Sequence, residues 1–111
     1  MREIVATPLF DTRLAEILEH YAERGATKLL ARFEKSFSEF TKNLEKLDKI
    51  GVPYVWRTQG KAVHVRKFAV STGSRAFTIL YWIPPDDADE SEPILLINVK
   101  GGLQNRFKWV K

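Results

Sequence analysis

Two side chains suited to proton transfer and phosphate binding stand close together in the sequence, His64 and Arg66. An imidazole takes and gives protons near neutral pH, and a guanidinium binds phosphate through paired N–H groups. In a β-strand, residues two positions apart share a face. Arg75 follows a predicted turn at residues 71–74 and could reach the same place. This set suits metal-independent RNA cleavage, in which the 2′-hydroxyl loses its proton and the pentavalent phosphorane must be neutralised.

Each of these residues also has a structural interpretation. A histidine on a strand is commonly a half-buried packing residue, and strand arginines are commonly solvated. We treat His64, Arg66 and Arg75 as candidate catalytic residues. The candidate RNA- or phosphate-binding residues are five further cations: Lys61, Lys67, Lys100, Arg106 and Lys108.

The distribution of charge points to a polyanionic partner. The 111 residues include 18 Lys and Arg against 14 Asp and Glu, a formal net charge of +4. Five acids lie within residues 86–92 and the rest before residue 49, so residues 50–85 and 93–111 contain no carboxylate. Basic segments interleaved with aromatic residues favour contact with nucleic acid or the ribosome. An acidic protein partner, or a solvated basic face, would give the same pattern. Trp56 and Trp109 could stack on bases or pack at the edge of a sheet.

Several classes of protein are excluded by composition. Without cysteine there is neither a disulfide framework nor a thiolate metal site. The acids among the first 30 residues argue against a targeting peptide, and no apolar run approaches the ~18 residues that span a bilayer. The acidic stretch at 86–92 lacks the glycine and spacing of a calcium loop, and we interpret it as solvated. We expect a cytoplasmic protein with no metal, cofactor or membrane contact.

The first half of the chain has the periodicity of two helices. After an opening strand at residues 3–6, apolar residues at i, i+3, i+4 and i+7 from Leu14 predict a helix capped by Asp11 or Thr12 and ended by Gly25. A second helix is predicted at residues 27–49. Its packing seam steps by three and four residues: Leu30, Phe33, Phe37, Phe40, Leu44 and Leu47.

The second half has the alternating pattern of strands. They are predicted at residues 62–70, 75–83 and 94–99, with a further edge strand possible at 103–111. Tyr81 and Trp82 would then face opposite sides, so that one of them belongs to the core. The order β-α-α-β-β-β predicts a single α+β domain over residues 1–111. Its helical hairpin covers one face of a small antiparallel sheet, and the other face is left open for function.

This order of elements, with several local cues, resembles the RelE/ParE superfamily of bacterial toxins from toxin–antitoxin systems. The HigB-like branch gives the best match to the strand that opens with an arginine and runs into aromatic residues. The cues are the segments 4–8 (IVATP), 51–53 (GVP), 64–67 (HVRK), 75–81 (RAFTILY), 98–102 (NVKGG) and 106–108 (RFK).

The resemblance implies one of two activities, cleavage of mRNA in the ribosomal A site or inhibition of DNA gyrase. It also implies an antitoxin partner that masks the basic face. Many ribosome-dependent members carry a catalytic tyrosine in the tail, whereas this chain has Phe107 after Arg106, and a phenylalanine donates no proton. The ribosome-associated endoribonuclease is the favoured expectation. The alternatives are a gyrase inhibitor without hydrolytic activity and a basic binding domain of the same fold.

Overall fold

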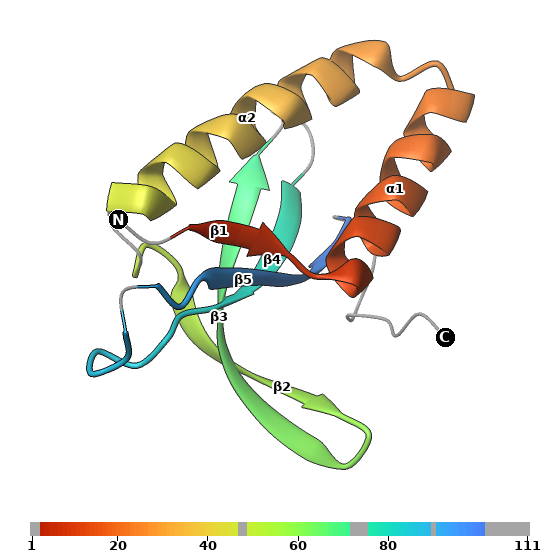
Figure 1. Cartoon of the computed structure of the whole chain (residues 1–111). Helices are drawn as coiled ribbons and strands as arrows, with labels where there is room; N and C mark the ends of the chain where they lie inside the picture. Colours follow the sequence, from red (N-terminus) through yellow and green to blue (C-terminus); the bar gives the residue numbers. More distant parts are fainter. Residues whose placement is uncertain (1–2, 47–48, 72–75, 90, 102–111) are drawn as a thin grey trace.

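Two helices pack against one face of a five-stranded mixed sheet in the computed structural model of the chain (Figure 1). The structure describes residues 3–46, 49–71, 76–89 and 91–101. The elements follow the order β1 (Ile4–Ala6), α1 (Pro8–Glu23), α2 (Thr27–Lys46), β2 (Val52–Thr58), β3 (Lys61–Ser71), β4 (Ala76–Trp82) and β5 (Ile94–Lys100). The predicted α+β class is confirmed. The predicted strand at 103–111 lies outside the described residues, as do Arg75, Arg106 and Lys108.

The sheet is mixed rather than wholly antiparallel, because β1 runs parallel to β5 at one edge. The strand order is β1-β5-β4-β3-β2, and the other three pairings are antiparallel. The backbone N–H of Thr7 extends the parallel pairing by donating to the carbonyl oxygen of Leu96 at 3.0 Å. The predicted antiparallel pairing is confirmed for β3 to β5, and β1 adds a parallel pair that was not predicted, because an apolar strand of three residues carries no signal for its direction.

The structure adds the strand β2, which pairs with β3 from Val52–Lys67 to Thr58–Lys61. The two strands form a hairpin whose turn residues, Gln59 and Gly60, have φ angles of 47° and 75°. Positive φ at both positions is the geometry of a type I′ turn, which matches the twist of the flanking strands. The hairpin extends well beyond the two helices (Figure 1).

The first helix starts earlier than predicted. Thr7 is its N-cap, where the side-chain Oγ1 accepts a hydrogen bond from the backbone N–H of Phe10 at 3.2 Å, and Pro8 follows as the first helical residue. Proline suits this position because its ring fixes φ near the helical value. The N–H that proline lacks would have no partner within the helix at this position. The predicted caps Asp11 and Thr12 therefore lie within the helix. Gly25, at a φ of +69°, follows its end as predicted.

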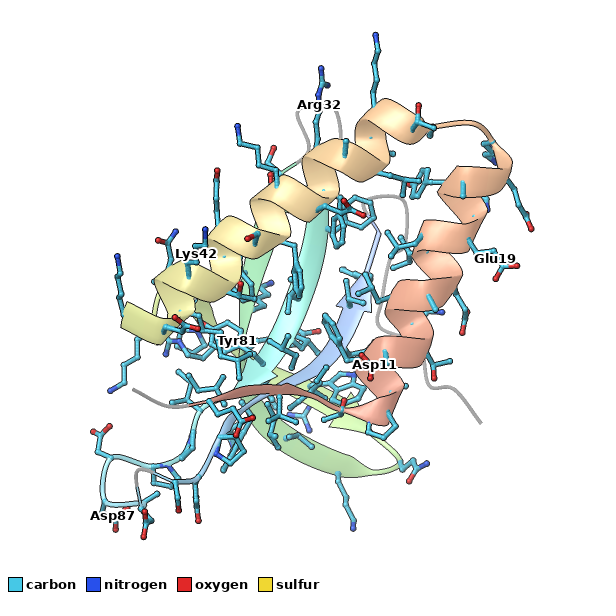
Figure 2. The ribbon with its side chains drawn as sticks, turned by 45° about the horizontal axis from the view of Figure 1, so that its top comes forward. Asp11, Glu19, Arg32, Lys42, Tyr81 and Asp87 are labelled. Carbon is cyan, nitrogen blue, oxygen red and sulfur yellow. The ribbon has the colours of Figure 1, made fainter. Side chains whose placement is uncertain are left out.

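The main core lies between the helices and the sheet. Phe33, Phe40 and Leu44 of the predicted seam are buried there, and the ring of Phe40 meets those of Phe68 and Tyr81 at centroid distances of 5.0 and 5.8 Å. Tyr81 is buried in this core, whereas Trp82 packs on the opposite face, as expected. In Figure 2, charged side chains of the helices, such as Glu19, Arg32 and Lys42, point away from the sheet.

Thr7→Ala is expected to lower the free energy of unfolding by about 1–2 kcal/mol, because it removes the N-cap. It also removes a hydrogen bond that the hydroxyl donates to the carbonyl oxygen of Leu96 at 2.9 Å. Chemical denaturation of the variant would measure this loss. Thr12→Ala is the matched control, since Thr12 is exposed within α1. Equal stability of the two variants would contradict the capping role.

Candidate functional site

The sheet face away from the helices, here called the far face, carries a second apolar cluster. Trp56, Val65 and Leu80 are buried in it, and five partly buried apolar residues pack against them: Leu9, Tyr54, Val63, Trp82 and Ile97. The cluster covers part of the face that we expected to be open. Trp56 is only 6% exposed, so it serves packing rather than base stacking.

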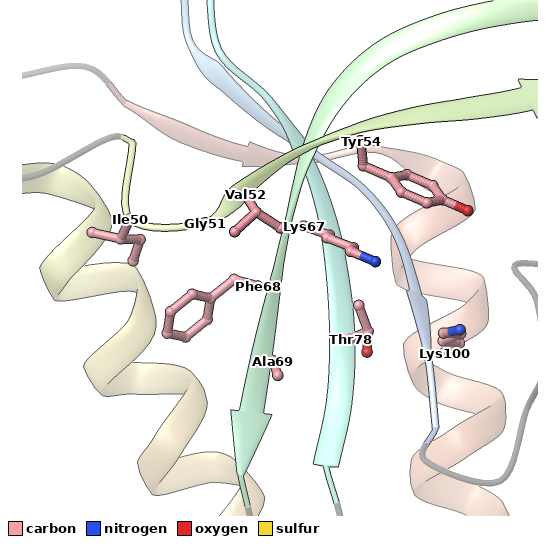
Figure 3. Close-up of a pocket in the computed structure, with 9 residues that line it drawn as sticks. All are labelled: Ile50, Gly51, Val52, Tyr54, Lys67, Phe68, Ala69, Thr78 and Lys100. Atoms are coloured by element: carbon pink, nitrogen blue, oxygen red, sulfur yellow. The ribbon is translucent and has the colours of Figure 1, made fainter.

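Beside this cluster, where β2 begins, the protein has a groove of about 510 Å³ (Figure 3). We call it the lysine groove. Its lining is formed by nine residues: Ile50, Gly51, Val52, Tyr54, Lys67, Phe68, Ala69, Thr78 and Lys100. In Figure 3 the polar ends of Tyr54, Lys67, Thr78 and Lys100 lie on one side of β3, and the ring of Phe68 lies on the other, toward α2.

Strand register explains why the polar groups meet. Thr78 on β4 lies directly opposite both Ala69 on β3 and Lys100 on β5, and directly opposed residues share a face. Lys67 lies two residues before Ala69 and therefore on the same face. The ammonium of Lys67 also stands 4.8 Å from the centre of the Tyr54 ring, close enough for a cation–π interaction.

The lysine groove has the composition of a phosphate-binding site. Two ammonium groups supply positive charge, the hydroxyls of Tyr54 and Thr78 are further donors, and none of the nine lining residues is acidic. Lys67 and Lys100 are half-buried, so their attraction to an anion is screened less than that of fully exposed lysines. Val52 is 54% exposed and pairs with Lys67 on the same face, so it adds apolar surface against which a sugar or a base can pack.

His64 and Arg66 lie on the other side of β3, because their positions alternate with those of Val65 and Lys67. They share a shallow depression of about 290 Å³ with Lys49 and Asp86. The Lys49 ammonium stands 3.6 Å from a carboxylate oxygen of Asp86 in an exposed ion pair. His64 is exposed. The structure thus brings together two of the three predicted catalytic residues, His64 and Arg66, but separates them from the lysine groove.

Arg66 contacts the chain that leaves α2. Its Nη2 donates hydrogen bonds to the carbonyl oxygens of Gly51 and, at 3.2 Å, Lys49. Its Nε is buried without a hydrogen-bond partner among the described residues. On the same segment, the backbone N–H of Gly51 donates to the hydroxyl of Tyr81 at 2.8 Å. Arg66 therefore has a structural partner that its position in the sequence did not reveal.

Among the described residues, one further predicted binding residue, Lys61, lies away from the lysine groove. Lys61 is exposed beside the hairpin turn, at the end of β3 remote from Lys67. Our sequence reasoning missed Tyr54 and Thr78 as possible site residues. The available signal for Tyr54 was the run of β-branched and aromatic residues at 52–56, followed by Gln59-Gly60, because a hairpin there places Tyr54 opposite Val65.

Among the described residues, no group of three or more His, Asp or Glu side chains is placed to hold a metal ion. Neither of the two described helices is long and apolar enough to cross a membrane. Comparison of the chain with models of known protein families, with curated proteins and with solved structures found no match.

Proposed function

We propose that the protein is the toxin of a toxin–antitoxin pair and that it blocks translation by binding and cleaving mRNA on the ribosome. The observation that carries this proposal is the lysine groove. Two half-buried lysines and two hydroxyl-bearing side chains converge there from four strands. All four residues lie in the two segments that contain no carboxylate, residues 50–85 and 93–111. Such a site suits the sugar–phosphate backbone of a single strand.

Two further features support a RelE/ParE-like toxin. The order of the elements is compatible with the resemblance, since an opening strand and two helices precede a run of antiparallel strands. In addition, the groups in the lysine groove suit phosphodiester cleavage without a metal. Ammonium groups stabilise the charge that grows on the phosphorane, and an ammonium or a phenol can give a proton to the leaving 5′-oxygen. The proton of the attacking 2′-hydroxyl passes to solvent water, because no carboxylate or imidazole is among the nine lining residues.

The partner in this proposal is an antitoxin that covers the lysine groove. Carboxylates on the antitoxin would pair with Lys67 and Lys100 and exclude RNA from the groove. Electrostatic attraction of this kind also speeds the encounter between partners, which suits an inhibitor that must act quickly.

A gyrase inhibitor of the ParE kind is the second candidate. It is favoured by the position of His64, because the imidazole lies on the other side of β3 from the lysine groove and is not placed to act on a phosphate bound there. In this reading the lysine groove binds an acidic surface or DNA and performs no chemistry. A basic binding domain without toxicity is the third.

Induced expression in a host that lacks the antitoxin separates these candidates, with primer extension on a reporter mRNA during the response. We expect growth arrest with new 5′ ends inside translated codons, which supports the ribosome-dependent nuclease. Arrest with intact mRNA and a DNA-damage response would instead support the gyrase inhibitor. Absence of arrest, with soluble protein present, would contradict both toxin functions.

Variants assign the activity to one side of β3. If the lysine groove is the site, Lys67→Met abolishes the new 5′ ends whereas His64→Ala leaves them. The opposite result would return the chemistry to the His64–Arg66 depression. Lys35→Met is the matched control, since Lys35 is an exposed lysine on α2.

A further inference from the structure

The segment between α2 and β2 forms one wall of the lysine groove and is held from behind. Ile50, Gly51 and Val52 line the groove, as Figure 3 shows. On the other side of β3, the guanidinium of Arg66 donates to the carbonyl oxygens of Lys49 and Gly51. The wall is therefore fixed by a residue whose side chain does not line the groove itself.

Tyr81 holds the same segment from the core. Its ring is fully buried against Phe40, and its hydroxyl accepts the hydrogen bond from the backbone N–H of Gly51. Gly51 thus has its N–H bound to Tyr81 and its carbonyl oxygen bound to Arg66. Both polar backbone groups of this buried glycine are satisfied by side chains, which rigidifies the backbone at this point.

The fixed segment lies directly against the backbone of Lys67. Gly51 approaches so closely that a Cβ at this position would overlap the carbonyl oxygen of Lys67 and stand 2.8 Å from the Tyr81 hydroxyl. Val52, the next residue, pairs with Lys67 in the sheet. Movement of residues 49–52 would therefore change the width of the lysine groove beside its central cation.

We propose that Arg66 is a positioning residue of the lysine groove, which acts with Tyr81 by clamping Gly51 against β3, and that it is not itself a phosphate ligand. The inference rests on the proposed function in so far as the groove binds RNA. It assigns to Arg66 a role different from the phosphate clamp that its position beside His64 indicates. The role follows from the direction of its hydrogen bonds, which are donated to the backbone of this chain.

The salt dependence of RNA binding distinguishes the two roles. The slope of log K against log salt concentration counts phosphate contacts, at about 0.7 per contact for a single strand. We would measure the affinity for a short fluorescent oligouridylate at several salt concentrations. The proteins compared are the wild type, Arg66→Met, Tyr81→Phe and Lys67→Met. Tyr81→Phe is the matched variant, because it releases Gly51 without removing a charge.

We expect Arg66→Met and Tyr81→Phe to weaken binding about fivefold or more, with salt slopes that equal each other. Lys67→Met should lower the slope by about 0.7. If the slope for Arg66→Met falls below that for Tyr81→Phe by the same amount, Arg66 is a phosphate ligand and the proposal is wrong. If Lys67→Met lowers the slope as expected but Arg66→Met and Tyr81→Phe bind with unchanged affinity, the proposal is equally wrong.

Hydrogen exchange provides a readout that needs no RNA. Arg66→Met and Tyr81→Phe should both speed amide exchange at residues 50–52, whereas Lys67→Met should not. Exchange that stays at the wild-type rate in Arg66→Met would refute the clamp. If no variant lowers the salt slope, but Arg66→Met and Tyr81→Phe exchange faster at residues 50–52, the lysine groove is not the RNA site and the clamp is still supported. Circular dichroism spectra verify that each variant is folded. If Arg66→Met does not fold, Tyr81→Phe still tests the clamp through its RNA affinity and its amide exchange at residues 50–52.

Discussion

Simultaneous replacement of Lys67 and Lys100 by methionine is expected to lower the affinity for single-stranded RNA about 25-fold at about 0.1 M salt. Each lost phosphate contact removes about 0.7 from the salt slope, which corresponds to about fivefold in affinity at that concentration. The aliphatic part of each side chain is retained by methionine, so packing beside Tyr54 and Thr78 changes little. Fluorescence anisotropy with a labelled oligonucleotide measures the effect.

The control for this variant has the same change in net charge at a different place. Lys35 and Lys42 are exposed on α2, on the opposite side of the sheet from the far face. Their joint replacement by methionine should reduce affinity no more than about twofold, through the general field of the protein. Equal losses in the two double variants would show that RNA is attracted by net charge alone, and the lysine groove would lose its special role.

The second large effect is expected from Phe40→Ala, which should lower the free energy of unfolding by about 3–5 kcal/mol. Phe40 is 2% exposed, and its ring contacts the rings of Phe37, Phe68 and Tyr81. Truncation leaves a cavity between α2 and the sheet that these neighbours fill only in part. A loss of this size is a large part of the stability of a typical domain.

Urea denaturation of Phe40→Ala, followed by tryptophan fluorescence, measures this loss. Phe40→Leu should lose less, because leucine keeps most of the apolar volume. Glu39→Ala, at the exposed neighbouring position, should stay within about 0.5 kcal/mol of the wild type. If Phe40→Ala were as stable as Glu39→Ala, α2 would not pack on the sheet through this seam.

The helical half of the fold was predictable because its pattern is strong and local. Apolar residues recur at steps of three and four over most of α2, and that period excludes a strand. The strand β2 was missed for an equally local reason. Type I′ turns favour Asn or Asp before Gly, whereas this turn has Gln59, and Pro53 was interpreted only as the end of the preceding helix.

The sequence predicted individual cations of the candidate site but not which residues come together to form it. Lys67 and Lys100 were each expected to contact phosphate. The pattern of a single strand does not reveal, however, that Thr78 on β4 lies between the strands of these two lysines. The strand order and register decide this, and both depend on long-range pairing. The partner of Arg66 is likewise set by where the chain returns from α2, which no periodicity reveals.

The parallel pairing of β1 with β5 determines when, during synthesis of the chain, the lysine groove can form. The Thr7 hydroxyl bonds to Leu96, 89 residues further along the chain, and Lys100 is the last residue of the same strand. Contacts so distant in sequence form late, because both partners must have been synthesised and a long loop must close. A nascent chain whose β5 has not yet left the ribosome therefore has no assembled lysine groove, and the proposed activity starts only after β5 has joined the sheet.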